Sequence, residues 1–247
     1  MELQWPLIIF TTLVAWSAGV FGTQGALASG GHACRSQMPL LAISVALLAV
    51  SGIAVFFHLE HWERIFNGFG HLSSGITQEF IVIVVFAIVA VVYFVFLRRS
   101  GDGTVPRWMG WAALAISAIL VVVCAHSYVM AARPAWDSAL EVLSLVGASL
   151  LMGPATCGAV MALCGDDASA LGLPAVAAAA AGAALVVAYA AFLQASGGSF
   201  AEVGYYFDPT HPTAGMADAA SAVAAQAPLL WIGAVAVGGI LPLAAAF

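Results

Sequence analysis

The chain has 247 residues, of which 63% are hydrophobic and only 7% are charged, and its formal net charge is −6. A soluble domain carries roughly 25% charged residues, so this composition excludes a globular surface in water. The absence of any basic run argues against a nucleic-acid partner. We therefore expect an all-α, polytopic membrane helix bundle that forms a single domain over residues 1–247 and is surrounded by membrane lipid.

Seven apolar runs predict transmembrane helices, since each is long enough to cross a hydrocarbon core of roughly 30 Å. They cover residues 5–27, 38–57, 78–97, 108–131, 139–163, 168–193 and 228–247. The first run is expected to be a retained helix and not a signal peptide, because Glu2 and no positive charge precedes it. The fifth run is interrupted by Gly153-Pro154, and an interfacial helix is expected at 215–226.

The arginines predict an orientation. With seven spans the loops alternate sides, and one face holds four arginines while the other holds two together with the N-terminus. The first group is Arg35, Arg98, Arg99 and Arg107, and the second is Arg64 and Arg133. Because cytoplasmic loops carry the excess of basic residues, we expect the N-terminus outside.

Three ionisable residues near the outer ends of the spans are candidates for chemistry: His58, Glu79 and His126. Ionisable groups at membrane depth are costly, so each one suggests a functional site. Oxidation of a quinol releases two electrons and two protons, and histidine, with a pKa of about 6.5, suits proton transfer. The alternatives are that the histidines are solvated or cap helices, and that Glu79 caps a helix and complements its dipole.

Bound metal groups are not expected on this chain. The four cysteines have no CxxC spacing, and no predicted span has a histidine at mid-membrane that could ligate haem iron. We therefore expect no haem, no iron–sulfur cluster and no other metal site.

One block of sequence is specific. Residues 58–67 read His-Leu-Glu-His-Trp-Glu-Arg-Ile-Phe-Asn and are followed by Ser73-Ser74 and Gln78-Glu79. This block closely resembles the membrane anchor subunits of the dimethyl sulfoxide reductase type (the DmsC family). Weaker similarities lie at residues 5–11, at Tyr128 with residues 134–136, and at Gly153-Pro154. The resemblance covers residues 5–160, and beyond them it rests on hydropathy alone.

The resemblance implies a role in anaerobic respiration at the bacterial cytoplasmic membrane. Such anchors hold a ferredoxin-like iron–sulfur subunit and a molybdopterin catalytic subunit on the membrane, and they oxidise menaquinol without a prosthetic group of their own. It implies catalytic roles for His58 and Glu79, and a quinol-binding site made by these two with Arg64, His126 and Tyr128.

Two features of this chain depart from the family. Family members have eight spans, so an eighth would have to lie within residues 194–227. They also have an arginine near the position of His126 or Ser127, which this chain lacks.

Two other functions stay open on the residues alone. The chain could be a purely structural anchor that holds partners without quinol chemistry. It could also be a small membrane transporter, although transporters place their binding groups near the midplane on broken helices. Here the polar groups gather at one face, which favours the quinol hypothesis.

Overall fold

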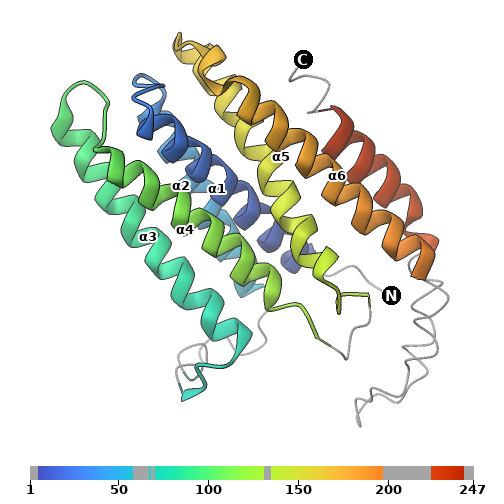
Figure 1. Cartoon of the computed structure of the whole chain (residues 1–247). Coiled ribbons are helices and arrows are strands. Elements are labelled where there is room, and N and C mark those ends of the chain that lie inside the picture. The colour runs from blue at the N-terminus through green and yellow to red at the C-terminus, as the bar shows by residue number, and fades with distance from the viewer. Residues whose placement is uncertain (1–4, 58–66, 68–69, 131–134, 197–223, 242–247) are drawn as a thin grey trace.

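The structure is a computed structural model that describes residues 5–57, 67, 70–130, 135–196 and 224–241 (Figure 1). Its long helices are α1 (Trp5–Ser29), α2 (Gln37–Phe56), α3 (Gly75–Ser100), α4 (Arg107–His126), α5 (Ala139–Cys164) and α6 (Gly172–Ser196). A short 3₁₀ turn, η2 (Ala168–Leu171), precedes α6, and a π-helical segment, η4 (Leu229–Ile240), follows it. No strand occurs within these residues.

The expected all-α membrane bundle of about seven helices is confirmed. In the described part of the chain, six helices are long and apolar enough to cross a membrane, and η4 is a shorter apolar helix of 12 residues. The chain is thus a multi-pass membrane protein. The expected interfacial helix at 215–226 and any eighth span fall largely at 197–223, outside the described residues.

The third, fourth and fifth helices differ from the expectation. The third helix begins at Gly75 and not at residue 78, so Glu79 lies beyond its first turn. The fourth ends at His126, five residues earlier than expected. The fifth helix runs unbroken from Ala139 to Cys164 with Pro154 inside it. An internal proline removes one hydrogen bond, and transmembrane helices tolerate that loss.

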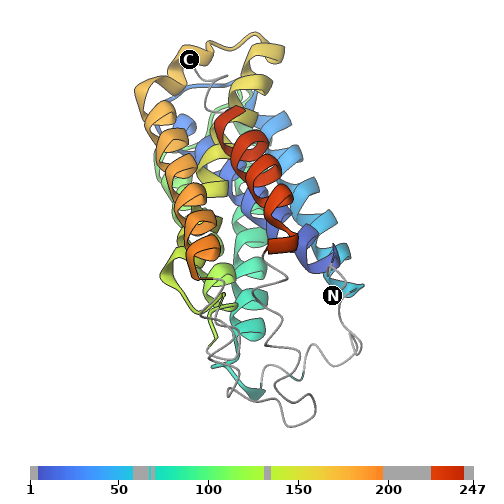
Figure 2. The same ribbon diagram turned by 90° about the vertical axis from the view of Figure 1, so that its right-hand side faces the viewer.

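Helix α1 is the centre of the bundle. It packs against α2, α4 and α5, while α3 lies on the outer side of α4 and α6 lies on α5. The segment η4 packs mainly against α6 (Figure 2). Half of the most apolar stretch of α1 and of α4 is buried, against about a fifth of that of α2, α3 and α6. Helices α2, α3 and α6 therefore form the lipid-facing perimeter.

Glycine pairs set the distance between the packed helices. At three helix crossings, a Cβ added to either glycine would collide with the backbone of the facing helix. The pairs are Gly19 with Gly153 (α1 and α5), Gly25 with Gly110 (α1 and α4), and Gly147 with Gly182 (α5 and α6). Small residues allow this approach in a membrane, where no hydrophobic effect drives helices together.

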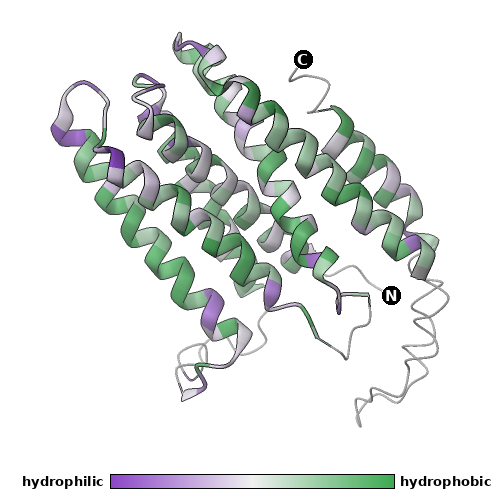
Figure 3. Ribbon diagram, viewed as in Figure 1, coloured by the Kyte–Doolittle hydropathy of each residue, from purple (hydrophilic) through white to green (hydrophobic). Residues whose placement is uncertain are grey.

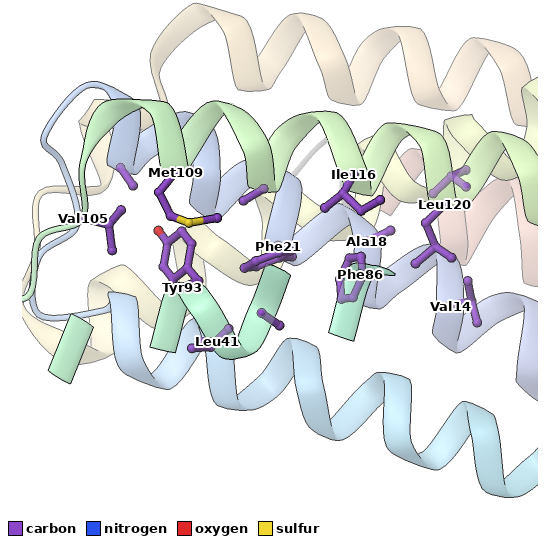
Figure 4. Close-up of a cluster of buried hydrophobic side chains, with 14 of the residues drawn as sticks. Val14, Ala18, Phe21, Leu41, Phe86, Tyr93, Val105, Met109, Ile116 and Leu120 are labelled. Carbon is purple, nitrogen blue, oxygen red and sulfur yellow. The ribbon is translucent and has the colours of Figure 1, made fainter. Parts of the chain in front are cut away.

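Aromatic rings fill the space between α1, α3 and α4. Phe21 packs edge-on against Phe86 and Tyr93, with ring centroids 5.0 and 5.3 Å away, and Met109 and Leu120 of α4 are buried in the same cluster (Figure 4). The outward faces are apolar as well, as Figure 3 shows for α3. An apolar interior with an apolar exterior is expected of helices in lipid.

Buried hydrogen bonds join α1 to α2 and α3. Gln24 Nε2 donates to the backbone oxygen of Gln37 at 2.7 Å and to its Oε1 at 3.0 Å, and the Tyr93 hydroxyl donates to the same Oε1 at 2.6 Å. Nearer the middle of α1, Ser17 Oγ lies 2.8 Å from the backbone oxygen of Ser44. These bonds hold the three helices in register at one end of the bundle, which we call the arginine end after Arg35, Arg98, Arg99 and Arg107.

Candidate functional site

Glu79 is the only carboxylate among the described residues that is almost fully buried, with 7% of its surface exposed. It lies in α3 near the end of the bundle opposite the arginine end, which we call the Glu79 end. The start of α3 is pressed against the end of α4, because a Cβ at Gly75 would lie 2.8 Å from the Cβ of Ser127. That close approach brings Ser127 beside Glu79.

Ser127 is the hydrogen-bond partner of Glu79. Its hydroxyl donates to Glu79 Oε1, and the same Oγ lies 2.9 Å from the backbone oxygen of Cys124. A serine hydroxyl has one hydrogen and two lone pairs. With Glu79 ionised, Ser127 donates to the carboxylate. With Glu79 protonated, the carboxyl can donate to Ser127 Oγ while the serine hydrogen turns to the Cys124 carbonyl. The contact is satisfied in both protonation states.

This geometry does not favour a capping role for Glu79. The residue before α3 is Ser74, whose side chain makes no capping hydrogen bond, and no acidic residue lies in the first turn of the helix. Glu79 instead reaches across to the end of another helix. Burial of a charge without such a partner is costly, so the placement of this carboxyl calls for a functional explanation.

Tyr128 follows Ser127 and belongs to the same site. Its ring is half-buried and meets Trp136 edge-on at 6.0 Å between centroids. Burial raises the pKa of the Tyr128 phenol, and the nearby Glu79, Cys124 and Glu141 raise it further. The phenol therefore keeps its proton at neutral pH and is a hydrogen-bond donor.

The other expected site residues are placed less centrally or not at all. His126 is the last residue of α4, and its side chain is exposed. At that position a protonated histidine would complement the helix dipole. His58 and Arg64 lie outside the described residues, so their relation to Glu79 stays a prediction. Ser127 occupies the region where the resemblance led us to look for an arginine.

Sequence reasoning missed a second carboxyl group at this end. Glu141 lies in the first turn of α5, and its Oε2 is buried with no hydrogen-bond partner among the described residues. The spacing Ser138-x-x-Glu141 matches a capping box, which would have explained it as structural. However, the Ser138 backbone N–H, which a capping-box glutamate would bind, donates to the Trp136 oxygen at 2.8 Å.

Two further findings concern metal binding and similarity to known proteins. Within the described part of the chain, no group of three or more histidine, cysteine or acidic side chains is placed to bind a metal ion. No protein-family model matches the chain, and no similar protein was found among the curated proteins or the solved structures.

Proposed function

We propose that this protein is the membrane anchor subunit of a molybdenum oxidoreductase complex of the dimethyl sulfoxide reductase type. In this role it binds menaquinol from the bilayer, oxidises it, and passes the electrons to a ferredoxin-like iron–sulfur subunit. A molybdopterin subunit then reduces the terminal substrate. The proposal combines the resemblance of residues 58–79 with the site around Glu79.

The observation that carries the proposal is the Glu79–Ser127 contact. A group that accepts a proton from substrate must be tolerated both charged and neutral, and Ser127 can satisfy Glu79 in either form, because Cys124 offers its hydroxyl a second acceptor. Tyr128 adds a protonated phenol that can donate to a quinol oxygen.

Access from the membrane also supports a lipid-soluble substrate. Large apolar side chains at the ends of α2 and α3 are open to the surroundings, among them Phe57, which is 79% exposed, Ile53 and Ile76. A hydrophobic quinol would reach the site sideways between α2, α3 and α4. The contact between α2 and α3 is much slighter than that between α3 and α4.

The reaction removes two electrons and two protons from the quinol. In the proposed mechanism, His58 accepts one hydroxyl proton and Glu79 accepts the other, because each hydroxyl needs a base within hydrogen-bond reach. Arg64 orients this segment of the chain or holds Glu79 ionised. The two electrons leave one at a time to an iron–sulfur cluster of the partner docked at the same end. We propose that this end faces outward.

The test begins with purification of the complex from its host in mild detergent, followed by mass spectrometry of its subunits. The purified complex is then mixed with a short-chain menaquinol, and reduction of the partner's clusters is followed by stopped-flow absorbance. Glu79→Gln and His58→Ala should slow cluster reduction on the order of 10²-fold, with all subunits still present.

The matched control is Asp102→Asn at the arginine end. Asp102 is an exposed carboxylate that binds Thr104 in a surface loop far from Glu79, so its loss should leave the rate unchanged. Unchanged rates in both site variants would contradict the quinol role and leave a purely structural anchor. A preparation without an iron–sulfur partner would contradict the anchor function altogether.

A further inference from the structure

Glu79 needs a route for its proton after each turnover. With 7% of its surface exposed, it has little direct contact with solvent. A buried base that cannot return its proton to water stays protonated and cannot serve the next quinol. Two hydroxyl groups are candidates for this route: that of Ser127, which binds Glu79, and that of Tyr128, which interacts electrostatically with Glu79.

Several contacts bring Glu79, the end of α4 and the start of α5 together in one region of the bundle. Ser127 binds Glu79, and the next residue, Tyr128, meets the ring of Trp136. The backbone oxygen of Trp136 accepts from the N–H of Ser138, the N-cap of α5. The hydroxyl of Tyr189, in α6, donates to the Ala135 oxygen at 2.9 Å and links α6 to the same region.

Glu141 is the carboxyl group at the start of α5 in this region. The Ser138 hydroxyl caps α5 by accepting from the N–H of Leu140 at 3.1 Å. The Ser138 N–H is also occupied, by Trp136, so the capping-box role of Glu141 is not filled. Its Oε2 is buried and free among the described residues, while the side chain as a whole is half-buried. One oxygen thus faces the protein interior while the residue remains within reach of solvent.

We propose that Glu141 is a proton-relay residue that takes the proton of Glu79 by way of the Tyr128 hydroxyl and releases it to water. The inference rests on the proposed function of Glu79. In the transfer, the Glu79 O–H bond breaks and its proton joins the Tyr128 oxygen, while the Tyr128 O–H proton moves to Glu141. No electrons are transferred, and Tyr128 is neutral before and after the transfer. Loss of the Glu141 proton to water resets the site.

Two properties of the surroundings support this path. The pKa of Tyr128 is raised by burial and then by Glu79, Cys124 and Glu141, so the phenol gives up its proton only as it receives another. The described titratable side chains that interact with Glu141 are Tyr128 at the end of α4 and Tyr189 of α6. Neither is a base that would compete for the proton at neutral pH.

The experiment follows successive quinol oxidations in the purified complex. A partner with several iron–sulfur clusters accepts electrons from more than one quinol, so stopped-flow traces with short-chain menaquinol contain a first oxidation and later ones. In Glu141→Gln, at an alkaline pH that leaves Glu79 ionised before mixing, the first oxidation should keep its rate, because it does not depend on the relay. Later oxidations should slow about tenfold or more, with a larger solvent isotope effect in D₂O. Glu141→Asp should restore much of the later rate.

The matched control is Asp137→Asn, an exposed acidic residue four positions earlier in the same connection. It should leave both phases unchanged. Later oxidations as fast in Glu141→Gln as in the unaltered complex would overturn the relay. An equal slowing of the first and later oxidations would also overturn it, since it would indicate a structural defect. If Glu79→Gln alone has no effect, the proposed function fails and the relay fails with it.

Discussion

Asp166, two residues after α5, binds Ser36, the residue that precedes α2. Its Oδ2 accepts from the Ser36 N–H at 2.8 Å and from the Ser36 hydroxyl at 2.6 Å. Arg35 contributes to the same junction, because its guanidinium lies 3.5 Å from the oxygen of Gly165. A carboxylate at a helix N-terminus interacts favourably with the helix dipole. This contact ties together two loops about 130 positions apart at the arginine end.

The Asp166 junction gives a pH dependence of stability. Burial alone would raise the pKa of Asp166, but hydrogen bonds from Ser36 and Arg35 and the charge of Arg35 outweigh it and lower that pKa. The stabilisation by the charge is therefore complete above the unfolded pKa of about 3.9. It is lost as pH falls through the lower folded value.

Asp166→Asn should reduce the free energy of unfolding at pH 7 by about 0.5–1 kcal/mol, and salt should reduce the difference because the site is near the surface. Thermal unfolding in detergent at pH 7 and at pH 3 measures the effect, and the gap between variant and unaltered protein should narrow at the lower pH. Asp137→Asn, an exposed carboxylate at the opposite end, is the control. A gap that stays constant with pH would contradict the assignment to charge.

The glycine crossings predict where the bundle tolerates no side chain. Gly153→Leu should destabilise the fold, because a Cβ there already overlaps the backbone of Gly19 in α1. Overpacking costs about 1–3 kcal/mol of folding free energy. Helix backbone atoms cannot relieve the overlap by rotating away, as a side chain can. Gly52→Leu in α2 is the matched control, since nothing lies within 4 Å of its Cβ position. Thermal unfolding in detergent should separate the two variants, and equal melting temperatures would contradict the packing described for α1 and α5.

Ser127→Ala tests the partner of Glu79. The substitution removes the donor to Glu79 Oε1 and leaves the carboxylate buried without it. Loss of a hydrogen bond to a charged group costs about 1.5–3 kcal/mol, so quinol-driven cluster reduction should fall roughly tenfold to a hundredfold. Ser29→Ala is the control, because among the described residues its hydroxyl bonds only within its own turn, at the arginine end. A rate equal to that of the unaltered complex would show that Glu79 does not depend on Ser127.

Hydropathy was sufficient to predict the fold, because segments surrounded by lipid must satisfy their backbone groups internally and so form helices. The residues at which helices end were harder to predict from the sequence. The early end of α4 at His126 coincides with the contact of Ser127 with the start of α3, which no local pattern records.

The site was predictable only in part. Glu79 could be found from the cost of placing a charge at membrane depth. Ser127 could not, because a serine near a helix end is ordinary and its role depends on where α3 meets α4. Glu141 was hidden for a different reason: its spacing from Ser138 matches a capping box, and only the observed hydrogen bond from the Ser138 N–H to the Trp136 oxygen shows that this box is not formed.

The four cysteines provide a test of the proposed orientation without altering the chain. Cys124 and Cys157 are buried in the bundle, whereas Cys34 and Cys164 are partly exposed, and both lie at the arginine end. If that end faces the cytoplasm, as the arginine excess indicates, a membrane-impermeant maleimide should label inverted vesicles and leave intact spheroplasts unlabelled. Asp137→Cys adds a thiol at the Glu79 end and should make intact spheroplasts reactive. Labelling of the unaltered protein in intact spheroplasts would place the arginine end outside, and the Glu79 site would then face the cytoplasm.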